Sequence, residues 1–276
     1  ILSPDKLTIR VTVTTSDNSP ITVEGCDKTE FTSGTSTKLE AKSTKVVFKG
    51  KITELNCKSS ELISLNVQGC SSLKELNCSH NKLTSLNVQN LSALQKLDCS
   101  WNPLTSLNMQ GLNALKELDC SYSHNQLTSL NATGCTALEK LDCRNGKLTE
   151  LNVQGCFFLK ELECRNNQLS SLSVQGLRDL HTLGCIENQL TSLNVQGLST
   201  LQRLDCEGNR LTSLNVQGLS ALQELKCSDN QLTELDVEDL ISLQELYCGD
   251  NQLPELNVHG CASLKKLKCL SNKLNA

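Results

Sequence analysis

The chain has 276 residues, of which 38% are hydrophobic and 20% are charged, and its formal net charge is -4. This composition is typical of a folded protein with a substantial core, and the mild acidity favours neither nucleic acid nor an anionic membrane as a partner. No apolar run approaches the roughly 18 to 20 residues of a membrane span, so we expect no membrane insertion in this segment.

The first 50 residues are rich in β-forming residues. The stretches KLTIRVTVTT, SPITVEG and TKVVFKG are predicted strands, separated by turns rich in Ser, Thr and Gly. We interpret residues 1–50 as an N-terminal β-rich cap, preceding a different segment at residues 51–276. No basic and apolar leader follows Ile1, which is expected of a processed or trimmed chain.

Residues 51–276 contain an internal repeat. Eleven cysteines, from Cys57 to Cys269, recur every 21 residues, except for a 23-residue step from Cys120 to Cys143. The repeated unit is LxxLxCxxNxLxxLxVxx(L/C)xx, and the two extra residues lie in SYSHNQ, 121–126. An insertion there belongs to a loop of one coil and leaves the period intact.

The unit predicts a solenoid. LxxLxC supplies a short strand whose Leu and Cys face one way, and a single strand of this kind cannot bury its apolar face alone. Stacked coils would join about eleven such strands into a parallel sheet, with the LTSLNV stretches closing the core as short extended segments. The Asn three residues after most of these cysteines is predicted to bond backbone groups of its own and the adjacent coil, a ladder that Ser60 and Gly146 interrupt.

This repeat resembles the leucine-rich repeats of the internalin family, and specifically its cysteine-ladder branch, in which Cys replaces a core Leu. The resemblance covers residues 52–276. It implies a right-handed parallel β superhelix of 21-residue coils, and a bacterial cell-surface or secreted protein that binds and does not catalyse. Adhesion, biofilm formation and virulence are the associated functions. The β-type cap departs from the helical cap of many internalins, which puts their host-receptor functions in doubt.

The pattern of the 16 cysteines indicates neither a metal site nor a catalytic thiol. No CxxC pair suggests a metal site, and a thiol in a Leu position lacks a base to activate it, so we expect no enzyme activity, metal or cofactor. Most are predicted to be thiols, because parallel inward Cβ atoms stay nearly 5 Å apart. The redox states of Cys26, Cys135 and Cys156 stay open.

Candidate binding residues lie at the third, fifth, seventh and eighth positions of LxxLxCxxN, which we expect to point outward as the inner face. His80, Trp101 and Tyr122 share the eighth position in successive coils, with His124 close by, and predict an aromatic binding patch. Arg144 and Arg165 follow in the seventh position, and Tyr247 is a second anchor. Local packing of Trp101 over Pro103, and drift of exposed residues, are the structural alternatives.

Phe157 and Phe158 lie on the opposite side, where most coils have small residues. We expect Phe158 to fill a core corner and Phe157 to be exposed.

Two functions follow. The first is adhesion of a monomer, by this face, to a protein or glycan of a host or a neighbouring bacterial cell. The second is a structural spacer that projects another domain from the cell surface. Because the last coil is directly followed by KLNA, we expect the natural chain to continue, with signal and anchor segments outside this sequence.

Overall fold

The computed structural model describes residues 1–122 and 126–274, and contacts divide the chain into two units. Unit 1 consists of Ile1–Thr128 and Gly134–Leu138. Unit 2 consists of Ser129–Thr133 and Glu139–Ala276.

The cap of unit 1 is built from five strands. They are β1 (Thr8–Thr15), β2 (Ile21–Glu24), β3 (Glu30–Phe31), β4 (Thr37–Glu40) and β5 (Val47–Lys49). β1 pairs antiparallel with β4, and also with β6 (Ile52–Asn56), the first strand of the repeat. β2 pairs antiparallel with β3 and β5. The β1–β6 pairing covers a sheet edge that would otherwise leave backbone groups unpaired.

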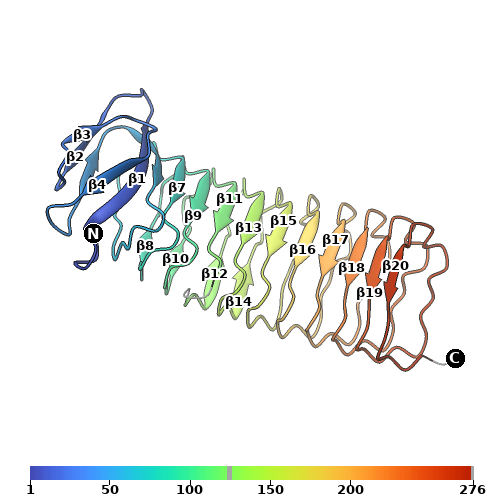
Figure 1. The fold of residues 1–276 in the computed structure, drawn as a ribbon. Helices are drawn as coiled ribbons and strands as arrows, with labels where there is room; N and C mark the ends of the chain where they lie inside the picture. The colour runs from blue at the N-terminus through green and yellow to red at the C-terminus, as the bar shows by residue number, and fades with distance from the viewer. Residues whose placement is uncertain (123–125, 275–276) are drawn as a thin grey trace. The chain divides into compact units, whose positions relative to one another are not determined.

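The coils of unit 1 stack in parallel (Figure 1). Their main strands are β6, β7 (Glu75–Asn77), β9 (Lys96–Asp98) and β11 (Glu117–Asp119). On the other side of the coils, β8 (Leu86–Asn87) pairs in parallel with β10 (Leu107–Asn108). These two-residue strands lie in the LTSLNV stretches, which confirms that those stretches are extended and not helical.

Unit 2 repeats the same arrangement. Its main strands, paired in parallel in chain order, are β13 (Lys140–Asp142), β15 (Glu161–Glu163), β16 (Thr182–Gly184), β17 (Arg203–Asp205), β18 (Glu224–Lys226), β19 (Glu245–Tyr247) and β20 (Lys266–Lys268). On the other side, β12 (Ser129–Asn131) pairs in parallel with β14 (Glu150–Asn152). Each register joins residues 21 apart, as Leu183 joins Leu204. The predicted leucine-rich-repeat solenoid with a β cap is confirmed.

The core follows from the alternation of side chains along each strand. In LQRLDC, Leu204 and Cys206 are fully buried while Arg203 is exposed. Leu211, Leu214 and Val216 of the next stretch close the same coil and are buried too. The Cys of each LxxLxC unit therefore occupies an ordinary core position, as an apolar side chain smaller than Leu.

An asparagine ladder supports the turn after each main strand. The Asn102 amide donates to the carbonyl oxygens of Cys78 in the preceding coil and Cys99 in its own, at 2.9 and 3.1 Å. Its Oδ1 accepts the Leu83 N–H at 3.0 Å. Equivalent bonds are made by Asn81, Asn167, Asn188, Asn209, Asn230, Asn251 and Asn272. The predicted ladder is confirmed at these positions, while Asn125 lies outside the described residues.

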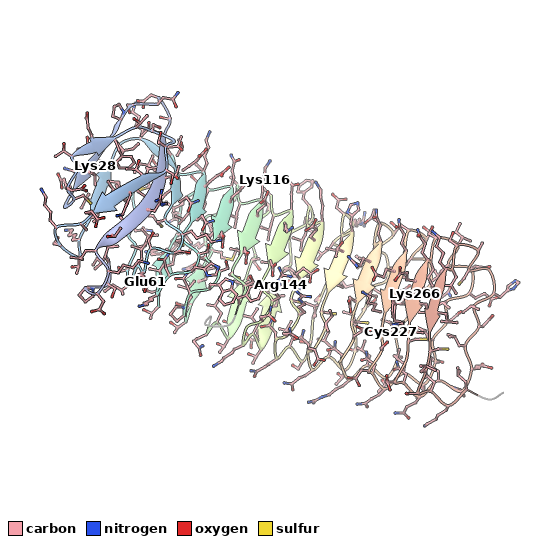
Figure 2. All side chains as sticks on the ribbon, viewed as in Figure 1. Lys28, Glu61, Lys116, Arg144, Cys227 and Lys266 are labelled. Atoms are coloured by element: carbon pink, nitrogen blue, oxygen red, sulfur yellow. The ribbon has the colours of Figure 1, made fainter. Side chains whose placement is uncertain are left out.

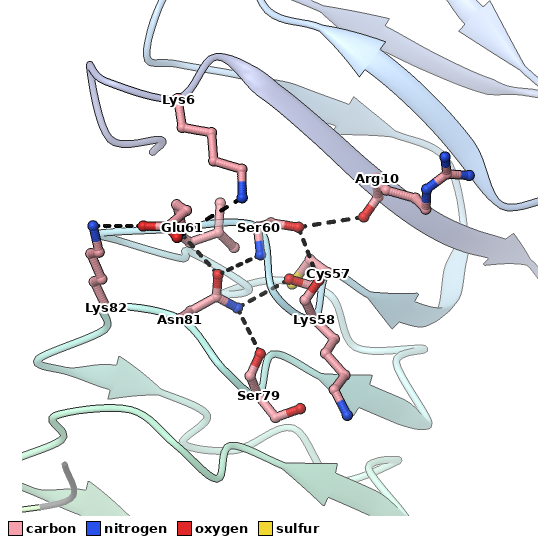
Figure 3. Close-up of polar contacts among 10 residues, drawn as sticks. Lys6, Arg10, Cys57, Lys58, Ser60, Glu61, Ser79, Asn81 and Lys82 are labelled. Carbon is pink, nitrogen blue, oxygen red and sulfur yellow. Dashed lines mark hydrogen bonds and ion pairs between the residues drawn. The ribbon is translucent and has the colours of Figure 1, made fainter.

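The ladder starts from Ser60 in the first coil (Figure 3). Asn81 Oδ1 accepts the Ser60 N–H at 3.1 Å, and the Ser60 hydroxyl lies 3.4 Å from the Arg10 carbonyl oxygen of β1. At Gly146 the backbone keeps its usual bond, because the Gly146 N–H donates to the Asn166 carbonyl at 3.1 Å. The interruption at Gly146 is therefore confined to the missing amide side chain, and the backbone is regular.

Phe157 and Phe158 are both well exposed, at 61% and 58%. The prediction that Phe158 fills a core corner is wrong, because its side chain is exposed, while the adjoining Cys156 and Leu159 are fully buried. The two rings form an apolar spot on the surface of unit 2.

Candidate binding site

The eighth position of the repeat has a left-handed backbone. All residues described at this position have φ between 50° and 67°: Ser59, His80, Trp101, Tyr122, Asn145, Asn166, Glu187, Gly208, Asp229, Asp250 and Ser271. Gly, Asn and Asp adopt this conformation with the least strain, whereas bulky side chains rarely do. The Trp and Tyr of unit 1 are therefore unusual occupants.

His80, Trp101 and Tyr122 form an aromatic stack in unit 1. The His80 and Trp101 ring centroids are 4.9 Å apart with planes inclined by 11°, and those of Trp101 and Tyr122 are 4.6 Å apart and inclined by 13°. The coil spacing imposes this distance, because neighbouring parallel strands lie about 4.8 Å apart. Both faces of the Trp101 indole are thus covered by the neighbouring rings. His124 lies outside the described residues.

Serines anchor the turns beneath the stack. Ser79, Ser100 and Ser121 are buried, and their hydroxyls donate to Asn77, Asp98 and Asp119 at 2.7, 2.6 and 2.5 Å. The expectation that the seventh position points outward is therefore wrong in these coils, because the hydroxyl turns back to the side chain two residues earlier. Each of these hydrogen bonds fixes the serine that directly precedes an aromatic residue in the sequence. The repeated Asx-Cys-Ser sequence is the feature from which this hydrogen bond could have been predicted.

The sheet face beside the stack is mainly acidic. On β6, β7, β9 and β11 the outward charged residues are Glu54, Glu75, Lys96, Asp98, Glu117 and Asp119. Lys96 pairs with Glu117 at 3.2 Å, an exposed ion pair of small energetic weight. A partner with positive charge near its contact residues would complement this face.

Arg144 and Arg165 lie in adjacent coils of unit 2. Arg144 Nη2 is 3.1 Å from Asp142 Oδ2, and the Asn145 N–H donates to the Arg165 carbonyl at 2.9 Å (Figure 2 labels Arg144). Arg165 Nε is buried without a hydrogen-bond partner among the described residues. These two predicted site residues are neighbours, but they belong to a different unit from the aromatic stack.

Tyr247 lies four strands beyond β15 in unit 2, about 19 Å at the usual strand spacing, so it is separate from the arginines. Its hydroxyl donates to Glu245 Oε2 at 2.7 Å. The ammonium groups of Lys226, Lys266 and Lys268 lie 5.4, 4.9 and 5.3 Å from its ring centroid. The contact of Lys226 with the Tyr247 ring was not predicted from the sequence, although residues 226, 247 and 268 share the fifth position of the repeat at 21-residue intervals.

Burial suppresses thiol chemistry in the core. It raises the pKa of Cys57 and Cys248 to about 12 and that of Cys156 to about 11. Within residues 1–122 and 126–274, no group of three or more His, Cys, Asp and Glu side chains is arranged to hold a metal ion. In the same part of the chain, no helix has the length and apolar character of a transmembrane span.

Known proteins share this architecture. Residues 72–94 match the family model described as Leucine Rich Repeat. The functional domain of InlJ from Listeria monocytogenes, whose structure is described as including a cysteine ladder, is 30% identical with a TM-score of 0.75. A leucine-rich-repeat protein of Leptospira interrogans is 28% identical with a TM-score of 0.70, and YopM of Yersinia enterocolitica is 28% identical with a TM-score of 0.59.

These similarities cover most of this chain but less of the other proteins. They span 86%, 81% and 78% of this chain, and 58%, 61% and 50% of InlJ, the Leptospira protein and YopM. No curated protein sequence matches the chain. The repeat, its buried cysteines and these structural similarities together make this chain a leucine-rich-repeat protein, similar in fold to the cysteine-ladder domain of an internalin.

Proposed function

We propose that this chain is a non-enzymatic module of a bacterial surface or secreted protein, and that it adheres through the aromatic stack to a protein on a host or neighbouring cell. Support of attachment or biofilm formation is part of this proposal. Leucine-rich-repeat proteins of this kind generally bind other proteins, and the three similar structures named above come from bacteria.

The supporting observation is the choice of residues at the left-handed position. A left-handed backbone costs a non-glycine residue roughly 1–2 kcal/mol, and each aromatic stacking contact returns roughly 0.5–1.5 kcal/mol. The three left-handed residues together cost about 3–6 kcal/mol and the two stacking contacts return about 1–3 kcal/mol. The stack therefore adds no stability compared with the Asn or Gly found at this position in other coils. A large aromatic surface held at little net gain in stability is typical of a binding site.

The geometry of the rings favours a protein partner over a glycan. A sugar ring packs against the open face of an aromatic ring, but His80 and Tyr122 cover both faces of Trp101. The edges of the stack and the acidic strand face suit a protein surface with apolar and basic side chains. The arginines and Tyr247 of unit 2 are proposed as secondary contacts.

The test is the double variant Trp101→Asn/Tyr122→Asn. Asn145 and Asn166 already occupy the equivalent position with φ of 55° and 54°, so Asn fits this backbone without strain. Wild type and variant would be screened by biolayer interferometry against host extracellular proteins, bacterial surface proteins and glycans. We expect a protein ligand whose affinity falls by about 30-fold in the variant, the effect of losing an interface hot spot.

The matched control is Asp229→Asn/Asp250→Asn, which changes the same repeat position in unit 2. Circular dichroism and urea unfolding would show that both variants are folded. Equal binding by wild type and the aromatic variant would refute the stack as the site. Absence of any ligand for wild type would favour the spacer function instead.

A further inference from the structure

The junction of the cap and the first coil contains a partly open cavity of about 480 Å³. Ile9 and Val11 of β1 and Phe48 of β5 line it from the cap, and Leu62, Val67 and Cys70 line it from the first coil. Fifteen of its 19 lining residues are apolar. All of them belong to unit 1, and the aromatic stack has no part in this cavity.

The cavity exists because the cap does not replace a preceding coil. In later coils Leu86 and Leu107 are buried at 5% and 8%, but the equivalent Leu65 is only half-buried. At the position of Leu91, which is buried, the first coil has the smaller and half-buried Cys70. β1 covers the strand edge of this coil, while the apolar residues on its other side face the cavity.

Ordered water is a poor occupant of this space. A buried water needs two to four polar partners, and only four of the 19 lining residues have polar side chains. Ser60 bonds Asn81 and lies near the Arg10 carbonyl, and Asn66 Oδ1 accepts the Gln68 N–H (Figure 3 shows Ser60). Protein interiors are close-packed, so an apolar space of this size is suited to an apolar ligand.

Lys45 is the charged side chain in the lining. Within the described residues 1–122 and 126–274, no carboxylate lies within ion-pair distance of its ammonium group. The side chain is exposed and so lies at the rim. An elongated apolar molecule with a negative head group would complement both parts of the site.

We propose that this cap cavity binds a free fatty acid, with the hydrocarbon chain among the apolar side chains and the carboxylate against Lys45. This site is independent of the proposed adhesive function, since its residues and its ligand are different.

The first test is titration of the full chain with the fluorescent fatty acid cis-parinaric acid. We expect saturable fluorescence enhancement, and a Kd that Lys45→Glu weakens about fivefold, the effect of exchanging an exposed attraction for a repulsion. Lys28→Glu makes the same charge change elsewhere in the cap and is expected to leave the Kd unchanged. Lauric acid should displace the probe more strongly than dodecanol, which has no carboxylate.

Thiol labelling locates the ligand. Cys70 and Cys269 are the two half-buried cysteines, and of these two Cys70 lines the cavity, as does the buried Cys57. Bound lauric acid should slow alkylation of Cys70, measured by peptide mass spectrometry, and leave Cys269 unchanged. The proposal is overturned by an absence of saturable fluorescence or by unchanged Cys70 labelling. Equal competition by dodecanol, with no effect of Lys45→Glu, would overturn the carboxylate assignment.

Discussion

At the scale of single residues, the asparagine ladder illustrates how a buried amide stabilises a turn. Asn209 Nδ2 donates to Cys185, Cys206 and Glu207 carbonyls at 3.0 to 3.3 Å, and its Oδ1 accepts the Leu190 N–H at 3.0 Å. Without the Asn209 amide, these backbone groups in the protein interior would lose these hydrogen bonds. A leucine of similar size satisfies none of them, which explains the Asn in an apolar surrounding.

Replacing Asn209 with Ala therefore leaves buried donors and acceptors without partners. We expect the free energy of unfolding to fall by about 3 kcal/mol, measured by urea denaturation followed by circular dichroism. The exposed Gln231→Ala is the control and should change it by less than about 0.5 kcal/mol. Equal midpoints for the two variants would contradict a stabilising role for the ladder.

At the scale of the strand, repetition places similar side chains next to each other, and charges then interact along the column. Asp205 at the end of β17 lies 3.8 Å from Lys226 of β18. Burial, followed by the charge of Glu207, raises the pKa of Asp205 to about 6. The folded chain therefore favours the neutral acid more than the unfolded chain does.

Ionisation of Asp205 makes folding less favourable as the pH rises. Because the folded pKa is the higher one, the ionised Asp205 weakens folding above pH 6, and the penalty disappears as the pH falls from about 6 to the ordinary value of 3.8. Asp205→Asn should raise the free energy of unfolding by about 2 kcal/mol at pH 8 and by no more than about 0.5 kcal/mol near pH 4. Urea unfolding at both pH values measures this.

The exposed Glu234→Gln provides the comparison for this measurement, because it removes a carboxylate from the same unit outside the strand column. An Asp205→Asn effect that is the same at both pH values would contradict the assignment to ionisation of Asp205.

At the scale of the whole molecule, the cysteines act as a set of buried apolar groups. Fourteen of the 16 are buried, and Cys70 and Cys269 are half-buried. Where burial raises a thiol pKa to 11 or 12, as at Cys156 and Cys57, almost no reactive thiolate exists at neutral pH.

A chromogenic thiol reagent should therefore react rapidly with about two thiols in the native protein and with all 16 after unfolding in urea. Peptide mapping would assign the rapid pair to Cys70 and Cys269. Rapid reaction of most thiols in the folded chain would show that the coils open readily and would contradict a tightly packed core.

The aromatic stack could be predicted from the sequence, because in a stacked repeat residues at equivalent positions of successive coils lie next to each other. Residues 80, 101 and 122 share one position in successive coils, so their rings had to be neighbours. Their mutual orientation and the burial of the adjoining serines depend on backbone angles and hydrogen bonds within the turns. The period does not contain that information.

The sequence by itself determined the parallel coils, the inward cysteines and the asparagine ladder, because each is enforced in every coil by the same burial and hydrogen-bonding requirements. Tertiary structure alone decided the features that arise where the repeat varies or meets other segments. These are the covered faces of Trp101, the lysines around Tyr247, the outward Phe158 and the cavity beneath the cap. These features depend on packing between side chains whose contacts are not determined by the 21-residue period.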